Sequence, residues 1–214
     1  MNTVILFDLD GTLTDPFEGI TKSVQYAAQH FGYDEPELEN LRHFIGPPLR
    51  EELRDTYNLT EEESYEAISL YRERFSTVGL FENKMFDGVP ELLSALKQNG
   101  ATLAIASSKP QKYVLQILEH FDILKYFNLV VGSEMDGTRT NKSECVAYAL
   151  QLLGNIDLTH TVMIGDRYHD AHGALDSKID VIAAGYGFSE DGEFENLPHV
   201  AIANSISELH DILI

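Results

Sequence analysis

Six short apolar runs, separated by segments with helical spacing, constrain the fold of this 214-residue chain more than any other feature. The runs are uniformly apolar rather than alternating, as expected of strands that helices cover on both faces. Strands that alternate with helices predict a mainly parallel, doubly wound α/β sheet. The predicted strands are Val4–Phe7, Thr102–Ala106, Asn128–Gly132, Thr161–Ile164, Val181–Ala184 and Val200–Ala203.

The interval between the first two predicted strands breaks this alternation. One apolar helical stripe runs through residues 17–31 and a second through residues 65–78. Thr60 followed by Glu63 is a capping-box pattern, which marks the start of the second helix. No strand pattern is present in this interval. It is therefore interpreted as a helical insertion into the α/β sheet.

This insertion divides the chain into two predicted domains. The α/β core comprises residues 1–13 and 86–214, and the helical insertion comprises residues 14–85. Ligands of such sheets bind in a crevice at the carboxyl ends of the strands. We expect the insertion to close over this crevice through hinges at Leu13–Phe17 and Asn83–Gly88, where proline and glycine interrupt the chain.

The charge balance argues against some classes of partner, and the single cysteine fits a reducing compartment. Asp and Glu number 35 against 15 Lys and Arg, a net charge of −20, which argues against nucleic acid polymers and anionic membranes. No apolar run reaches the roughly 18–20 residues of a membrane span, and the first residues lack the basic region of a signal peptide.

Cys145 is the single cysteine, which we interpret as a small core residue. We expect a soluble, cytoplasmic monomer or weak homodimer. Residues 179–214 contain no Lys or Arg, and their acidic side chains are expected to form a solubilising surface.

Paired carboxylates follow two of the predicted strands. Asp8 and Asp10 stand directly after the first strand, and Gly11 permits the chain to turn there. Asp166 and Asp170 follow the fourth strand. Because the carboxyl ends of parallel strands meet at one sheet edge, both pairs could surround a hard cation such as Mg²⁺. Close carboxylates repel one another without such a cation, so the arrangement indicates chemistry.

Two further strand ends carry groups that suit phosphoryl oxygens. Ser107 ends the second strand, and Lys142 follows the third. A hydroxyl donor and a compact cation at the edge that bears the carboxylates favour a phosphate-binding site.

Together these segments resemble the four motifs of the haloacid dehalogenase-like (HAD) superfamily, in its phosphoglycolate phosphatase-like branch. The resemblance covers essentially the whole chain, and the motifs stand in the expected order. They are Asp8-Leu9-Asp10-Gly11-Thr12, Ser107-Ser108-Lys109-Pro110, Lys142 and Gly165-Asp166-Arg167-Tyr168-His169-Asp170. The resemblance implies a Rossmann-like core with a small α-helical cap formed by the insertion.

The resemblance also implies roles for the acidic residues. Asp8 would be the nucleophile that forms an aspartyl-phosphate, and Asp10 would act as general acid and base. Mg²⁺ would bind Asp8, the backbone carbonyl of Asp10, and Asp166. Asp170 would support the metal through water or by orienting Lys142.

Phosphate binding is assigned with two alternatives open. Ser107, Lys142 and Thr12, with the backbone N–H groups of the first motif, would hold the phosphoryl group. Ser108 is an alternative to Ser107, and Lys109 is a rival of Lys142, because the Pro-x-Pro sequence that follows the lysine in many relatives is missing.

Other polar residues receive less specific interpretations. His169 and His172 could form a transition-metal site, but an oxygen-rich Mg²⁺ site accounts for their neighbourhood. Arg50, Arg72 and Lys22 of the insertion could contact the substrate, and exposed salt bridges are an equally good interpretation for each.

The resulting functional expectation is a Mg²⁺-dependent phosphatase that acts on a small phosphorylated metabolite in the manner of phosphoglycolate phosphatase. The alternatives are a 5′-nucleotidase acting on nucleoside monophosphates and a β-phosphoglucomutase-like phosphotransferase. A phosphate-sensing or adaptor protein is the non-enzymatic alternative.

Overall fold

The computed structural model describes residues 4–190 and 192–214, which form two compact units. The first unit comprises the residues up to Asp15 together with Met85–Ile214, and the second comprises Pro16–Lys84. The assignment of the first unit as the core and the second as the cap domain stays a prediction. Residues 1–3 lie outside the described residues. They belong to the predicted core domain and to the start of the chain, which is interpreted as lacking a signal peptide.

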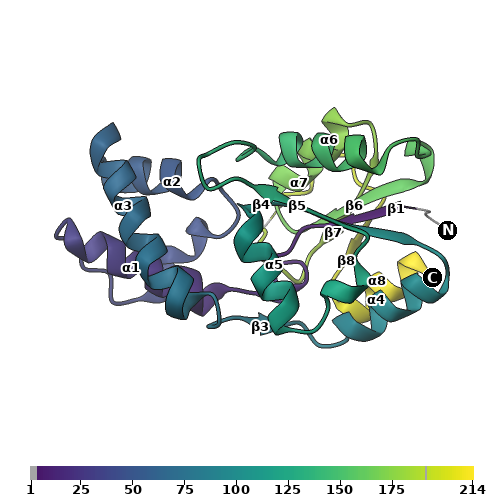
Figure 1. The fold of residues 1–214 in the computed structure, drawn as a ribbon, viewed down its shortest axis with the longest axis horizontal. Helices are drawn as coiled ribbons and strands as arrows, with labels where there is room; N and C mark the ends of the chain where they lie inside the picture. Colours follow the sequence, from purple (N-terminus) through teal and green to yellow (C-terminus); the bar gives the residue numbers. More distant parts are fainter. Residues whose placement is uncertain (1–3, 191) are drawn as a thin grey trace. The chain divides into compact units, whose positions relative to one another are not determined.

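The first unit contains a six-stranded parallel sheet, as predicted (Figure 1). Its strand order is β5-β4-β1-β6-β7-β8. Each strand coincides with a predicted apolar run to within a few residues. The strands are β1 (Val4–Phe7), β4 (Thr102–Pro110), β5 (Leu129–Ser133), β6 (Thr161–Gly165), β7 (Asp180–Ala184) and β8 (Ala201–Ala203).

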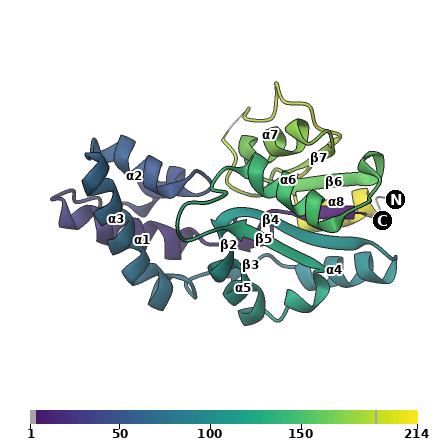
Figure 2. The same cartoon turned by 45° about the horizontal axis from the view of Figure 1, so that its top comes forward.

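Helices cover both faces of this sheet, so the unit is the doubly wound α/β fold that the sequence indicates. α6 and α7 lie on one face, and α4, α5 and α8 lie on the other (Figures 1 and 2). No helix in the described part of the chain is both long and apolar enough to cross a membrane. The helices are α4 (Val89–Gln98), α5 (Gln111–His120), α6 (Lys142–Leu153), α7 (Tyr168–Asp176) and α8 (Ile206–Leu213), with short 3-10 turns η3 (Leu124–Tyr126) and η4 (Leu158–His160).

The uniformly apolar strands follow from this two-sided burial. In β1, Val4 and Leu6 belong to the core cluster that includes Cys145 of α6 and Ala171 of α7. The intervening residues of β1 point to the opposite face, because side chains alternate along a strand. Every residue of β1 is buried. Full burial of each large aliphatic side chain stabilises the fold by roughly 1.5–3 kcal/mol.

The chain order places a ligand-binding position next to β1. From β1 the chain continues to β4 and β5 on one side, and then to β6, β7 and β8 on the other. β1 and β6 are direct neighbours, with Phe7 opposite Ile164 at their carboxyl ends. Open α/β sheets bind ligands at this topological switch point. The first and fourth predicted motifs follow these two strands.

The second unit is mainly helical, with a difference from the sequence prediction at its two connections. Two-residue strands β2 (Thr14–Asp15) and β3 (Lys84–Met85) pair with each other, although no strand was expected in this interval. Strands this short leave no periodic pattern in the sequence. The helices are α1 (Phe17–His30), α2 (Leu49–Tyr57) and α3 (Glu61–Arg74), with a 3-10 segment η1 (Leu38–Phe44) and a π-helical turn η2 (Phe75–Gly79).

The start of α3 confirms the predicted capping box, whereas the prediction of an apolar stripe along this helix is wrong at two of its residues. The N–H of Glu63 donates to Thr60 Oγ1 (3.3 Å), and the N–H of Thr60 donates to Glu63 Oε2 (2.7 Å). Tyr65 and Val78 of the expected stripe are 59% and 49% exposed. The helical period changes in the π-helical turn that contains Val78. The exposed Tyr65 ring makes a cation–π contact, with the guanidinium of Arg50 4.5 Å from its centre.

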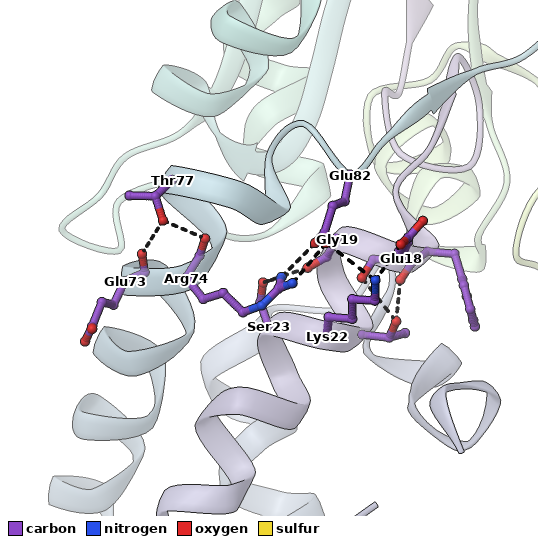
Figure 3. A network of polar contacts seen from close by, with 10 residues as sticks. Glu18, Gly19, Lys22, Ser23, Glu73, Arg74, Thr77 and Glu82 are labelled. Carbon is purple, nitrogen blue, oxygen red and sulfur yellow. Dashed lines mark hydrogen bonds and ion pairs between the residues drawn. The ribbon is translucent and has the colours of Figure 1, made fainter. Parts of the chain in front are cut away.

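A polar network joins α1 to the end of α3 (Figure 3). Arg74 binds both carboxylate oxygens of Glu82 (2.8 and 3.0 Å) and donates to Ser23 Oγ (3.1 Å). The Ser23 hydroxyl donates in turn to the carbonyl of Gly19 (2.7 Å). A Cβ atom at Gly19 would lie only 2.0 Å from the carbonyl oxygen of Gly79. Close backbone contact and the hydrogen bond from Arg74 to Ser23 therefore hold the π-helical turn against α1, and the bidentate ion pair joins the residues on either side of that turn.

Replacement of Arg74 by methionine is expected to lower the free energy of unfolding by about 1–2 kcal/mol. The change keeps the aliphatic stem but leaves the half-buried Glu82 carboxylate without its bidentate partner. Urea unfolding measures the difference. The control is Arg54→Met, which removes only ion pairs to exposed acids and should cost less than about 0.5 kcal/mol. Equal effects of the two changes would contradict the role given to Arg74.

Candidate active site

The first motif forms a tight turn directly after β1. The carbonyl of Leu9 accepts hydrogen bonds from the backbone N–H groups of residues 12–14 (2.9–3.3 Å). Gly11 has a φ of +78°, which favours glycine over any other residue. The backbone N–H of Asp8 continues the sheet pairing and donates a hydrogen bond to the carbonyl of Ile164 (2.9 Å). The turn therefore presents Asp8 and Asp10 at the carboxyl end of the central strands.

Three glycines leave room for two carboxylates of the fourth motif. A Cβ atom at Gly11 would lie 2.0 Å from Asp166 Oδ2, and one at Gly187 would lie 2.4 Å from Asp166 Cβ. A Cβ atom at Gly165 would lie 2.1 Å from Asp170 Cγ. Contacts this short are impossible for any side chain. The glycines thus form a close-fitting cradle around both carboxylates.

Asp8, Asp166 and Asp170 form a buried triad at this edge of the sheet. Each offers one oxygen, and the three atoms lie within 4.8 Å of one another. The N–H of Phe188 donates to Asp166 Oδ2 (2.7 Å), and the N–H of Arg167 donates to Asp170 Oδ2 (3.1 Å). Asp166 Oδ1 is buried and has no hydrogen-bond partner among the described residues.

Lys142, the first residue of α6, reaches the triad. Its Nζ lies 2.8 Å from Asp8 Oδ1 and 2.9 Å from Asp170 Oδ1, and its side chain is 4% exposed. It also donates to the carbonyl of Ala106 in β4 (3.2 Å). The rival lysine, Lys109, pairs instead with Asp10, with 2.5 Å between Nζ and Oδ2. The two lysines that the sequence could not distinguish therefore occupy different positions.

The electrostatics of the triad favour an additional cation. Burial, reinforced by the neighbouring charges of Asp170 and Asp8, raises the pKa of Asp166 well above its ordinary value. Burial raises the pKa of Asp170 to about 6, although Lys142 opposes the shift. For Lys142, burial lowers the pKa, but Asp170 and Asp8 outweigh it and raise the pKa overall. One ammonium group is thus too little charge to hold the pKa values of Asp166 and Asp170 at their ordinary level.

The triad fits a divalent metal ion by its donor chemistry. It supplies hard oxygen ligands in a glycine-lined position, and one buried oxygen of Asp166 has no partner among the described residues. Oxygen ligands of this type are those that Mg²⁺ and Ca²⁺ prefer. The residues present are therefore able to bind such a cation.

The predicted phosphate-binding residues lie around the same turn. Ser107 in β4 is buried, and its hydroxyl accepts a hydrogen bond from a backbone N–H two residues later (3.4 Å). Ser108 is half-buried, and its carbonyl accepts from the Ser133 hydroxyl (2.7 Å). Thr12 is fully buried, and its hydroxyl has no hydrogen-bond partner in the described part of the chain. Tyr186, which sequence reasoning missed, donates from its hydroxyl to the Thr12 carbonyl (2.9 Å).

A buried ion pair at the start of α7 was also missed. Arg167 Nε lies 3.1 and 3.2 Å from the two carboxylate oxygens of Glu193, and the N–H of Tyr168 donates to the same carboxylate (2.5 Å). The Glu193 side chain is only 8% exposed. The expectation that the acids of residues 179–214 form a solubilising surface is therefore wrong for Glu193. No local sequence pattern distinguishes this glutamate from its exposed neighbours.

The remaining candidates lie outside the triad. His169 packs on the ring of Tyr168, and burial, with the charge of Arg167, lowers its pKa to about 4. In the second unit, Arg50 pairs with Glu51 and Glu61. Lys22 pairs with Glu18 and Glu82, as Figure 3 shows.

Replacement of Gly11 by alanine is expected to lower the free energy of unfolding by about 3 kcal/mol or more. The new methyl group combines the cost of a positive φ with a collision against Asp166. Gly100→Ala is the matched control, because Gly100 has a φ of +83° and no atom of the described residues lies within 4 Å of where its methyl group would be. The control should lose only about 1–2 kcal/mol in urea unfolding. Equal losses would show that the cradle adds no steric constraint.

Comparisons with known proteins agree with this geometry. Residues 5–184 match the family model of haloacid dehalogenase-like hydrolases. A 5′-nucleotidase of Pseudomonas aeruginosa is 50% identical over 189 residues, which cover 88% of this chain and 85% of the relative. The tyrosine-protein kinase PtkA of Mycobacterium tuberculosis is 37% identical over 98% of this chain and 72% of the relative.

Phosphatases are also found among more distant relatives and solved structures. Phosphoglycolate phosphatase 1 of Pseudomonas aeruginosa is 25% identical over 98% of this chain and 78% of the relative. A crystal structure described as a predicted phosphatase from Clostridium acetobutylicum has a TM-score of 0.95 and 44% identity, covering 100% of this chain and 98% of that one. This chain belongs to the haloacid dehalogenase-like hydrolase family.

Proposed function

We propose that the protein is a Mg²⁺-dependent phosphomonoesterase that works through an aspartyl-phosphate and takes nucleoside 5′-monophosphates as its main substrates. The observation that carries the chemistry is the position of Lys142, which bridges Asp8 and Asp170 beside the unpartnered oxygen of Asp166. Such a centre combines a carboxylate nucleophile with fixed positive charge for a phosphoryl group.

The order of the substrate candidates rests on the comparisons. The sequence motifs favour a phosphoglycolate phosphatase-like activity and do not separate it from nucleotide hydrolysis. The relative named 5′-nucleotidase is 50% identical, against 25% for the relative named phosphoglycolate phosphatase 1. We therefore place nucleoside 5′-monophosphates first and 2-phosphoglycolate second.

In the first chemical step, a carboxylate oxygen of Asp8 attacks phosphorus as the ester P–O bond breaks. The leaving alkoxide takes a proton from the Asp10 carboxyl group and departs as the alcohol. Burial raises the pKa of Asp10, although Lys109 opposes the shift. The raised pKa favours the protonated form that this step needs. Lys142 and the Ser107 hydroxyl stabilise charge on the transferring phosphoryl group.

In the second step, water attacks the phosphorus atom of the aspartyl-phosphate. Asp10, now a carboxylate, takes a proton from that water as the bond between phosphorus and the Asp8 oxygen breaks. Inorganic phosphate leaves, and both aspartates return to their starting states. The same carboxyl group thus serves as acid and then as base.

The metal ion would be held by Asp8, Asp166 and the backbone carbonyl of Asp10, with Asp170 oriented toward Lys142. When bound, Mg²⁺ supplies Lewis-acid stabilisation of phosphoryl oxygens and offsets the repulsion among the carboxylates. Asp170 contributes through its ion pair with Lys142, which fixes the ammonium group within reach of Asp8.

A phosphorylated-metabolite panel tests this proposal. Phosphate release is measured with Mg²⁺ for nucleoside 5′-monophosphates, 2-phosphoglycolate and hexose phosphates, and ranked by kcat/KM. We expect the nucleotides to rank first. Isomerisation of a hexose phosphate without phosphate release would indicate a mutase, and transfer of phosphate from ATP to a tyrosine peptide would indicate a kinase. Tight phosphate binding without turnover of any ester would indicate a sensor or adaptor.

A further inference from the structure

A second, nearly buried lysine contacts the site through a different carboxylate. Lys109 lies near the end of β4, and its Nζ is 2.5 Å from Asp10 Oδ2. The two side chains are only 7% and 12% exposed. Lys142 pairs instead with Asp8 and Asp170. The two lysines of the site are therefore divided between the triad and Asp10.

This ion pair makes the two carboxyl oxygens of Asp10 different from each other. Oδ2 is held by Lys109, whereas Oδ1 is buried and has no hydrogen-bond partner in the described part of the chain. Proton transfer requires one oxygen to be directed at the reacting group. The contact with Lys109 fixes the orientation of the carboxyl group, because one oxygen is occupied by the ammonium group and the other is left for proton transfer.

The end of β4 is built to hold Lys109 in place. The register of β4 against β5 shifts between Ala106 and Pro110. Such an irregularity bends the strand and redirects its side chains. The irregular segment is fixed to β5 by the Ser133 hydroxyl, which donates to the carbonyl of Ser108 (2.7 Å). The backbone that carries Lys109 is therefore anchored independently of the ion pair.

We propose that Lys109 is a positioning residue for the acid and base of the reaction. By holding Oδ2 of Asp10, it assigns Oδ1 to proton transfer. That oxygen gives a proton to the leaving alkoxide in the first step and takes one from the attacking water in the second. The inference rests on the proposed function, and specifically on the role of Asp10 in it.

A competing role for Lys109 is direct binding of the phosphoryl group. The two roles differ in their dependence on the leaving group. A residue that acts through Asp10 affects the phosphorylation step only when the departing oxygen needs a proton, whereas a phosphate-binding residue affects that step for every ester. p-Nitrophenolate leaves readily without a proton, and the alkoxide of a nucleoside does not.

Rapid mixing of Lys109→Met with p-nitrophenyl phosphate and with a nucleoside 5′-monophosphate tests the proposal. With the first ester, we expect a burst of nitrophenolate near the wild-type rate, and then turnover at least about tenfold slower, because hydrolysis of the aspartyl-phosphate still needs Asp10. With the nucleotide, phosphorylation itself should be at least about tenfold slower. Lys109→Arg should recover part of the loss. Lys112→Met, an exposed residue of α5, should match the wild type.

The double variant Asp10→Asn/Lys109→Met provides the second readout. If Lys109 acts only through Asp10, the double variant should be no slower than Asp10→Asn, within about twofold. Equal slowing of the phosphorylation step with both esters by Lys109→Met, or multiplied losses in the double variant, would overturn the proposal. So would an unaffected Lys109→Met variant in an otherwise active enzyme. A wild-type protein that hydrolyses neither ester would overturn the proposed function together with this inference.

Discussion

Replacement of Asp8 by asparagine is expected to reduce the rate of phosphate release by at least about 10⁴-fold. Asparagine has nearly the same shape, but its amide cannot attack phosphorus or form the acyl phosphate. Single-turnover measurement of phosphate release in saturating Mg²⁺ gives the effect on chemistry directly. The aspartyl-phosphate, trapped by acid quench in the wild type, should be absent from the variant.

The control for this prediction is a neutralised acid outside the site. Asp136 lies on an exposed turn after β5, so Asp136→Asn should retain wild-type turnover. Asp8→Asn should keep the circular dichroism spectrum of the wild type, because Lys142 retains its contact with Asp170. Turnover at the wild-type rate in Asp8→Asn would exclude Asp8 as the nucleophile and overturn the proposed mechanism.

The sheet was predictable because its strands are buried on both faces. Val4–Phe7 and Thr161–Gly165 have no exposed residue, so each appears in the sequence as an uninterrupted apolar run. Parallel strands then bring their carboxyl ends to one edge, which places Asp8 near Asp166 without knowledge of any contact. The main features of the candidate site therefore follow from strand positions alone.

Contacts between distant loops were not predictable in this way. Tyr186 binds the carbonyl of Thr12 across 174 positions, and Glu193 pairs with Arg167 across 26. Neither pair has a periodic pattern, because loop residues obey no helical or strand period. The position of Gly187 against Asp166 is likewise visible only in three dimensions.

The choice between the two lysines shows the same limit more sharply. Lys109 and Lys142 both follow the ends of predicted strands, so topology places both near the site. Their partners depend on the irregular end of β4 and on the start of α6, where Asn141 accepts a hydrogen bond from the N–H of Ser143 (2.9 Å). Such local backbone geometry decides which carboxylate each ammonium group reaches. The sequence left both assignments open for this reason.

Removal of divalent metal by EDTA is expected to abolish turnover, with a loss of at least about 10³-fold, and to lower thermal stability in a pH-dependent way. Mg²⁺ at about 100 times its dissociation constant should stabilise the fold by about 2.7 kcal/mol. Differential scanning fluorimetry between pH 5 and pH 8, with and without Mg²⁺, measures the shift. The stabilisation should be larger at pH 7 than at pH 5.

The sign of this pH dependence comes from the triad. The folded-state pKa of Asp170 is raised from 3.8 to about 6, and that of Asp166 is raised in the same direction. Between about pH 4 and pH 6, the metal-free folded state therefore binds protons that the unfolded state has released, and its stability falls as pH rises through this window. Mg²⁺ competes with those protons, so its effect grows as they dissociate.

Asp166→Asn is the matched variant for the metal prediction. It removes one charge and one ligand from the triad while the Phe188 N–H can still donate to the remaining side-chain oxygen. The metal-free variant should lose less stability between pH 5 and pH 7 than the wild type, because one raised carboxyl group is gone. It should also gain little from Mg²⁺. A Mg²⁺-induced gain in thermal stability that is equal at pH 5 and pH 7, or undiminished in Asp166→Asn, would show that the metal binds elsewhere. Full turnover in EDTA would show that the reaction needs no divalent metal.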